Sequence, residues 1–239
     1  MTLHVEEPAC PAVTDLLDKT STKRYSTILA DPPWQFQNRT GKMAPEHKRL
    51  LRYPTMELPE IKSLPVVSLA EPNAHLYLWV PNALLQEGLD VMRAWGFTYK
   101  CNLVWYKIRK DGGPDGRGVG FYFRNVTELV LFGVRGSIRT REAGRTQVNI
   151  LATQKREHSR KPDEIYDLVE ACSPGPYLEM FARFRRDGWD QWGNEDVETN
   201  SLLGVAKRNG HAQASQMLLL DREKAYASDK QSKPMKRHR

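Results

Sequence analysis

Short apolar runs that alternate with amphipathic stretches are the feature that most limits the folds open to this chain. Residues 75–80 (HLYLWV) are almost continuously apolar, which is typical of a strand buried on both faces of a sheet. Further strands are predicted at 25–30, 97–107, 128–134, 148–151 and 177–182. Since strands that alternate with amphipathic helices favour parallel pairing, the pattern predicts an α/β sandwich. Its sheet is expected to be mainly parallel, with helices on both faces.

Two helices are predicted from the spacing of apolar residues. The first is expected to begin at the N-cap Asn82 and to end at Gly96. Its apolar face is predicted to consist of Leu85, Leu89, Met92 and Trp95. The second is expected to begin at Pro162, because proline suits the first helical position. Its core face is predicted to consist of Ile165, Leu168, Val169 and Cys172.

The length of 239 residues, 40% of them hydrophobic, suits one folded domain with small additions. We expect a loosely ordered lead-in at residues 1–24, the domain at 25–199 and a basic tail at 200–239. The lead-in lacks the apolar core of a signal peptide, and no run approaches the roughly 20 apolar residues that cross a bilayer. These features favour a cytoplasmic protein without a membrane partner. The three cysteines and the histidines lack metal-ligand spacing, so no metal site is predicted.

The positive charge is concentrated rather than spread. The net charge is +7, and residues 201–239 hold nine Lys/Arg against three Asp/Glu, a contribution of 9 − 3 = +6. A basic tail indicates a polyanionic partner, most often nucleic acid. A solvated tail that only keeps the protein soluble is an equally good interpretation of the tail alone.

The tetrapeptide Asp31-Pro32-Pro33-Trp34 follows the predicted strand 25–30, where ligands lie in sheets of this kind. Its chemistry suits methylation of an exocyclic amine on a nucleobase, whose lone pair is delocalised into the ring. The carboxylate of Asp31 and the carbonyl of Pro32 can accept the amine N–H groups and stabilise the charge that develops on nitrogen. The indole of Trp34 offers a flat face for a flipped-out base. Aspartate has an ordinary pKa of about 3.9, too low to deprotonate the amine beforehand. The alternative is a simple turn in which Trp34 is a core residue.

Six motifs occur in a fixed order: ADPPW, HLYLWV, N-x-x-E-x-x-L-x-G-x-R-G from Asn125 to Gly136, HSRKPDEIY, LEMFAR and WGNE. In this order the chain resembles the MT-A70 family of S-adenosylmethionine-dependent adenine-N6 methyltransferases, over roughly residues 25–195. The resemblance implies a Rossmann-like methyltransferase fold with circularly permuted motifs and S-adenosylmethionine as cofactor. It also implies that the tetrapeptide from Asp31 to Trp34 holds the target adenine.

The same resemblance implies a set of cofactor contacts. Lys161 would meet the carboxylate of the cofactor, and the ribose and amino-acid portions would lie against the late motifs. The implied cofactor-binding residues are Ala30, Asp31, Lys161, Glu179, Phe181, Arg183, Asn194 and Glu195. Four of them also have a plainer interpretation. Glu179 and Arg183 could form a salt bridge, Lys161 could be a surface lysine, and Asn194 could be a turn residue.

The chain departs from the family pattern in three places. Residues 19–25 carry no acidic residue to meet the cofactor's adenine, Glu195 stands where the family often has glutamine, and Arg160 stands where some relatives have histidine.

Basic loops are predicted to contact phosphates. A glycine-rich segment at 107–124 lacks the lysine and hydroxyl of a Walker motif and is better suited to gripping nucleic acid. The predicted nucleic-acid-binding residues are Arg39, Lys42, Lys48, Arg49, Arg109, Lys110, Arg117, Arg139 and Arg141. We therefore predict an N6-adenine methyltransferase acting on nucleic acid, DNA in preference to RNA. An RNA methyltransferase, a non-catalytic subunit and a plain basic DNA-binding module are the alternatives, and a monomer and a homodimer are both open.

Overall fold

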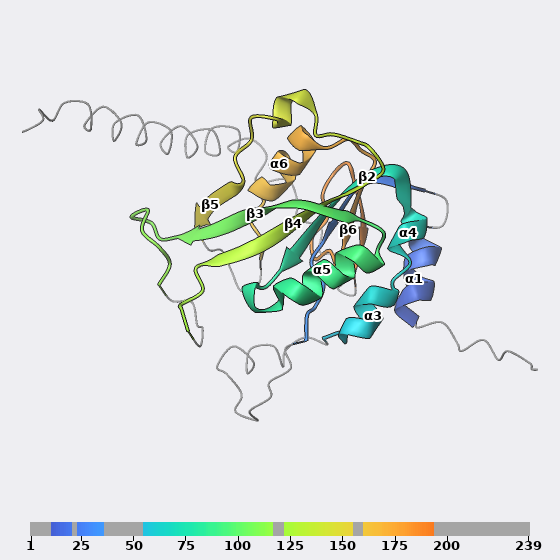
Figure 1. Cartoon of the computed structure of the whole chain (residues 1–239), viewed down its shortest axis with the longest axis horizontal. Coiled ribbons are helices and arrows are strands. Elements are labelled where there is room, and N and C mark those ends of the chain that lie inside the picture. Colours follow the sequence, from blue (N-terminus) through green and yellow to red (C-terminus); the bar gives the residue numbers. More distant parts are fainter. Residues whose placement is uncertain (1–10, 21–22, 36–54, 117–121, 155–159, 194–239) are drawn as a thin grey trace, which may run out of the picture. The chain divides into compact units, whose positions relative to one another are not determined.

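A seven-stranded sheet forms the centre of the protein in the computed structural model (Figure 1). The structure describes residues 11–20, 23–35, 55–116, 122–154 and 160–193. The strands are β1 (Tyr25–Ala30), β2 (Ala70–Val80), β3 (Thr98–Ile108), β4 (Thr127–Arg135), β5 (Ile150–Gln154), β6 (Tyr177–Met180) and β7 (Trp189–Trp192). They lie in the order β5-β3-β4-β2-β1-β6-β7.

Most neighbouring strands run parallel, as predicted. The pairs β1–β2, β1–β6, β6–β7 and β3–β5 are parallel, whereas β4 runs antiparallel to both β2 and β3. The first strand in the sequence lies between β2 and β6, so the segment after β1 leaves the sheet from its middle. In open α/β sheets this position, outside the carboxyl ends of central strands, is where ligands bind.

The apolar runs lie where the sequence predicts. Every residue from Ala74 to Val80 is buried, so β2 is covered on both faces. Side chains alternate between the faces, which sends Leu76 and Leu78 to one core and Tyr77 and Trp79 to the other. The sheet is therefore the middle layer of three.

One face of the sheet is covered by four helices, α1 (Pro11–Thr20), α3 (Leu58–Ser63), α4 (Val66–Leu69) and α5 (Leu85–Ala94). Their apolar side chains, among them Leu16, Ile61, Val66 and Met92, form one core with β1 and β2. Figure 1 shows α5 and α6 on opposite sides of the strands. The predicted α/β sandwich with helices on both faces is confirmed.

The other face is covered by α6 (Glu164–Cys172). The predicted core residues Ile165, Leu168, Val169 and Cys172 are buried, and they pack with Tyr77, Trp79 and Trp105. The helix begins two residues after Pro162, with Asp163 at the N-cap. The start of α6 therefore lies at the same edge of the sheet as the end of β1.

Three expectations about local structure were wrong. Within the predicted lead-in, residues 11–20 form α1, and Leu16 is completely buried because the helix packs on the main core. Asn82 does not cap a helix; it opens the short 3-10 helix η1 (Asn82–Leu84) and donates instead to the carbonyl of Thr127. Leu85 is 42% exposed, because α5 begins there and turns the side chain away from the sheet.

Among the residues that the structure describes, no helix has the length and apolarity needed to cross a bilayer.

Candidate active site

The carboxyl edge of the sheet brings together residues from five parts of the chain. Asp31 follows β1, Lys107 lies near the end of β3, and Glu128 lies at the start of the antiparallel β4. Lys161 precedes α6, and Glu179 lies on β6 beside β1, where the register pairs it with Leu29. These residues are far apart in sequence and share one edge because of the strand order.

Backbone hydrogen bonds hold the tetrapeptide after β1 in a fixed turn. The N–H of Asp31 donates to Met180 of β6, and the N–H of Trp34 donates to the carbonyl of Pro32 at 2.8 Å. The carbonyl of Pro33 accepts from the N–H of Met56 at 3.0 Å. One of the two lone pairs of the Pro32 carbonyl is thus used within the turn, and one remains for a ligand.

The side chain of Trp34 is a core residue in this structure. It is 6% exposed, it belongs to the core formed with α1 and α5, and its indole N–H donates to the carbonyl of Trp79 at 2.9 Å. The predicted open face for a stacked base is therefore corrected, because the side chain is buried in the core. The indole anchors the turn to β2.

Four charged side chains form one network at this edge. The ammonium of Lys161 lies 3.2 Å from a carboxylate oxygen of Asp31 and 2.8 Å from one of Glu128. The other oxygen of Glu128 accepts a hydrogen bond from Lys107. The four side chains keep between 14% and 28% of their surface exposed, so the network is half-buried but open to the edge.

The charged groups in this network are stabilised to different degrees by their neighbours. Burial would raise the pKa of Glu128, but the ammonium groups of Lys161 and Lys107 outweigh it and lower this pKa to about 2. Burial would lower the pKa of Lys161, but Asp31 and Glu128 outweigh it and raise this pKa above its ordinary value. For Asp31 burial prevails, so its pKa is raised even though Lys161 acts in the opposite direction. Of the two carboxylates in this network, Asp31 is therefore the one whose charge is less compensated.

The ammonium of Lys161 has capacity for one more acceptor. It carries three hydrogens, and Asp31 and Glu128 account for two. The same nitrogen lies 4.8 Å from the ring centroid of Trp79, so the ammonium also packs against an aromatic ring. A further carboxylate at this point would meet a cation that is already oriented.

Glu179 is a further half-buried carboxylate at the same edge. It accepts a hydrogen bond from the hydroxyl of Tyr166 at 2.8 Å, and Gln191 of β7 lies 3.5 Å from its other oxygen. Burial raises the pKa of Glu179 to about 7, and the negative charge of Asp31 adds to this. A carboxylate in this state is stabilised by hydroxyl donors, such as those of a ribose.

The other implied cofactor residues divide into three groups. Ala30 is completely buried at the end of β1, and Phe181, just after β6, adopts a φ of 64° while packing on Trp192. The positive charge of Arg183 lowers the pKa of Asp31 and so acts within the network. Asn194 and Glu195 lie outside the described residues.

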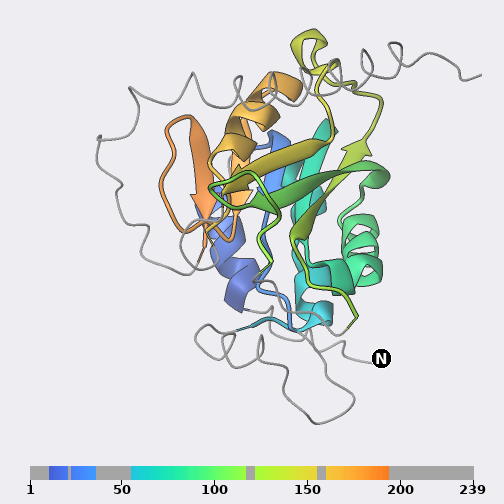
Figure 2. The same cartoon turned by 90° about the vertical axis from the view of Figure 1, so that its left-hand side faces the viewer.

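The predicted nucleic-acid contacts do not share one surface. Arg109 and Lys110 are exposed on the β3–β4 connection, at the edge that carries Asp31. Arg139 and Arg141 follow β4, and because β4 is antiparallel they leave the sheet at the opposite edge (Figure 2). Arg39, Lys42, Lys48, Arg49 and Arg117 lie outside the described residues.

The sequence analysis missed Glu128, Trp79 and Tyr166 as site residues. Glu128 fell within a family motif and at the start of an otherwise apolar strand, and an isolated charge there was the available signal. Trp79 and Tyr166 also lie within family motifs, HLYLWV and HSRKPDEIY, but their apolar neighbours make them look like ordinary core positions.

Comparison with known proteins gives one family. The model of the MT-A70 family matches residues 25–195. The chain is 31% identical over 189 residues to the type II methyltransferase M.MunI of Mycoplasma sp. This match covers 72% of this chain and 78% of that protein. It is 28% identical over 183 residues to the N(6)-adenosine-methyltransferase MT-A70-like protein of Drosophila melanogaster, covering 75% of this chain and 28% of that one. It is 26% identical over 183 residues to human METTL3, an N(6)-adenosine-methyltransferase catalytic subunit, covering 75% and 29%.

Proposed function

Because this chain belongs to the MT-A70 family of N6-adenine methyltransferases, we propose that it methylates N6 of adenine in nucleic acid, with S-adenosylmethionine as donor. The observation that carries the proposal is the partly exposed Asp31 carboxylate on a rigid turn at the carboxyl edge of the sheet, beside Lys161.

The residues at this edge fit the proposed cofactor. Lys161 has one unused hydrogen for a carboxylate, and Glu179 needs hydroxyl donors to hold its charge. We assign the methionine carboxylate to Lys161 and the ribose hydroxyls to Glu179, with Phe181 and Arg183 beside them. Asn194 and Glu195 are retained as proposed contacts from their motif. When bound, S-adenosylmethionine supplies an electrophilic methyl group on a sulfonium.

Asp31 is proposed to act on the amine of the target adenine. Its carboxylate accepts one N–H of the amine, and the free lone pair of the Pro32 carbonyl accepts the other. Both contacts strengthen as nitrogen gains positive charge, which lowers the barrier to attack on the methyl group. The raised pKa of Asp31 also suits it to receive the proton that nitrogen loses after methylation.

Trp34 is proposed to hold the turn from Asp31 to Trp34 in position. Its indole fastens the turn to β2, so the two acceptors keep their spacing when the adenine enters. Tyr122 and Phe123 on the β3–β4 connection are 94% and 85% exposed, and they are the most exposed large hydrophobic side chains of the described residues. We propose them in place of Trp34 as the stacking surface for bases near the target.

DNA is the proposed substrate. The chain corresponds to 78% of a type II methyltransferase but to 28% and 29% of two N(6)-adenosine-methyltransferases. RNA is the alternative, since adenosine is a ribonucleoside and several relatives bear its name.

The test is mass spectrometry of nucleosides after incubation of the protein with S-adenosylmethionine and matched DNA and RNA oligonucleotides. N6-methyldeoxyadenosine is expected, with a loss of about 10²-fold or more in rate for Asp31→Ala and Asp31→Asn. Asp90→Asn, which changes a carboxylate on α5, is the matched control and should keep the wild-type rate. Wild-type rates in Asp31→Ala would overturn the catalytic assignment, and faster transfer to RNA would replace DNA as substrate.

The competing function is a non-catalytic nucleic-acid-binding subunit. Calorimetric titration with S-adenosylmethionine separates it from the enzyme, because a subunit without a cofactor site gives no heat of binding. The free capacity of Lys161 and the state of Glu179 favour the enzyme.

A further inference from the structure

A pocket lies at the opposite edge of the sheet from Asp31. It has a volume of about 500 Å³, within the range of small-ligand sites. Its walls come from β2, β3, the end of β4 and the loop that follows β4. Glu128 and Arg135 are seven residues apart on β4, so the two edges are separated by roughly 20 Å along the strand.

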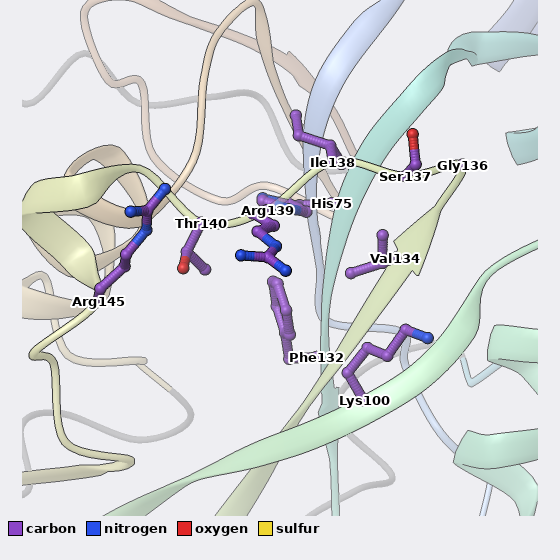
Figure 3. Close-up of a pocket in the computed structure, with 10 residues that line it drawn as sticks. All are labelled: His75, Lys100, Phe132, Val134, Gly136, Ser137, Ile138, Arg139, Thr140 and Arg145. Atoms are coloured by element: carbon purple, nitrogen blue, oxygen red, sulfur yellow. The ribbon is translucent and has the colours of Figure 1, made fainter.

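The rim of this pocket is cationic. Lys100, Arg139 and Arg145 line it, and its ten lining residues include no carboxylate. Within the described parts of the chain, none of the three cations has an ion pair or a side-chain hydrogen bond. Figure 3 shows Arg139 near Phe132, with Arg145 and Lys100 to either side. Three uncompensated positive charges around one hollow favour an anion.

The floor of the pocket is apolar and aromatic. Phe132 and Val134 of β4 are 9% and 8% exposed, and the His75 ring lies edge-on to Phe132 with centroids 4.9 Å apart. Such a floor can make apolar contact with the edge of a base rather than stack on it, and the cationic rim suits a phosphate attached to that base.

His75 adds a hydrogen-bond donor beneath the loop. Its Nδ1 lies 2.8 Å from the hydroxyl of Ser173, which lies 2.7 Å from the hydroxyl of Tyr77. If Tyr77 donates to Ser173 and Ser173 donates to Nδ1, each hydroxyl hydrogen has an acceptor and Nε2 carries the imidazole hydrogen. Nε2 is buried without a partner at hydrogen-bonding geometry. Burial lowers the pKa of His75, and the backbone of Ile138 acts in the opposite direction, so in this arrangement the neutral imidazole keeps an unused donor near Ile138 of the loop.

The loop that forms the outer wall is fixed at both ends. The N–H of Ser137 donates to the side chain of Asn73 at 2.9 Å, and the N–H of Arg141 donates to the carbonyl of Cys172 at 2.8 Å. Gly144 packs against Cys172 so closely that a Cβ would lie 2.6 Å from its Cα. The pocket is thus formed before any ligand arrives.

We propose that this pocket binds a nucleoside phosphate, with its phosphate among Lys100, Arg139 and Arg145 and its base on the floor at Phe132. The ligand is a free nucleotide or a nucleotide of the nucleic acid that flanks the target base. Nucleotide binding is inferred from the residues of this pocket and does not require methyl transfer.

The test uses uridine monophosphate, which offers no adenine to the edge at Asp31. Calorimetric titration is carried out with wild type, with Lys100→Gln/Arg139→Gln, and with Lys62→Gln as an exposed lysine on α3 away from the pocket. Wild type and Lys62→Gln are expected to bind equally, and the double variant about tenfold or more weaker. Asp31→Ala should bind as wild type, which separates this site from the proposed active site. Equal binding by the double variant, or no binding by wild type, overturns the proposal.

The source of the nucleotide is decided by a second measurement. If the pocket holds flanking nucleic acid, the double variant also loses affinity for a 30-residue oligonucleotide. If it holds a free nucleotide, the affinity for this oligonucleotide stays at the wild-type value while that for uridine monophosphate falls. Thermal unfolding of each variant confirms that these exposed substitutions leave the fold intact.

Discussion

At the scale of single residues, the site depends on how unequally its carboxylates are compensated. Glu128 is held between two ammonium groups, Asp31 by one, and Glu179 by neutral donors. The pKa of Glu128 is lowered to about 2, whereas the pKa of Asp31 is raised and that of Glu179 is raised to about 7. Glu128 therefore acts as the fixed charge that orients Lys161, and the other two are the groups that a ligand can change.

Glu128→Gln should lower the free energy of unfolding by about 2 to 3 kcal/mol at pH 7, because Lys107 and Lys161 each lose a carboxylate. The folded-state pKa of Glu128 is depressed to about 2 from 4.5. Its stabilisation is therefore present above pH 4.5 and is lost as the pH falls toward 2. Urea unfolding between pH 2 and pH 7 measures the difference. Glu142→Gln, at an exposed position in η2 (Glu142–Gly144), serves as control, and a difference independent of pH would contradict the assignment.

Glu179→Gln should show the opposite dependence. The folded-state pKa of Glu179 is raised to about 7 from 4.5, so wild type loses stability relative to the variant as the pH rises from 4.5 to 7. The full effect is at most on the order of 3 kcal/mol. If Glu179 holds ribose hydroxyls, the affinity of wild type for S-adenosylmethionine should also rise through pH 7, and that of the variant should stay flat. Parallel stability curves for the two proteins would count against the burial of this charge.

At the scale of elements, the turn after β1 and the helix before it depend on each other. α1 buries Leu16 in the core that also contains Trp34, and Asp15 of the same helix accepts a hydrogen bond from the indole of Trp192 at 2.8 Å. The helix therefore supports both the active-site turn and the end of β7. This explains why a segment without clear periodicity is ordered: its contacts are with distant strands rather than within itself.

Leu16→Ala should destabilise the protein by about 2 to 5 kcal/mol, because it leaves a cavity under β1. Thr14→Ala on the exposed side of the same helix is the matched control and should change stability by less than about 0.5 kcal/mol. Chemical denaturation of the two variants gives the comparison. Equal stabilities would mean that α1 is not part of the cooperative unit.

At the scale of the whole molecule, the antiparallel direction of β4 decides which charged side chains lie at each edge of the sheet. Its first residues bring Glu128 to the edge of Asp31, and its last residue sends the basic loop after Arg135 to the other edge. The basic segments that resemble one another in the sequence consequently serve two separate surfaces (Figure 2).

The affinity for duplex DNA should fall with salt, with a slope of about −0.9 for each phosphate contact. Lys110→Gln removes an exposed lysine at the Asp31 edge and should reduce the magnitude of that slope by about one contact. Lys62→Gln, with the same loss of charge on α3, should leave it unchanged. Fluorescence anisotropy over a series of salt concentrations gives both slopes, and identical slopes would remove Lys110 from the proposed interface.

Much of the architecture was predictable, because strands and core helices are encoded by local periodicity. The continuous run of β2 and the apolar spacing of α6 were read correctly, and so was the position of the tetrapeptide at a strand end. Most boundaries shifted by one to three residues, and β2 begins at Ala70, five residues before the predicted run. Asn82 does not cap the helix, because its side chain donates a hydrogen bond to Thr127 of β4 instead.

The sequence by itself determined the residue types of the site: a carboxylate before two prolines, a lysine before a helix, a carboxylate on a late strand. Only the tertiary structure decided their partners, because the order of strands in a sheet is set by contacts between segments far apart in the chain. The antiparallel insertion of β4 placed Glu128 between two lysines and carried Arg139 to the far edge. The burial of Trp34 was decided in the same way, since nothing local distinguishes an indole that faces a ligand from one that faces the core.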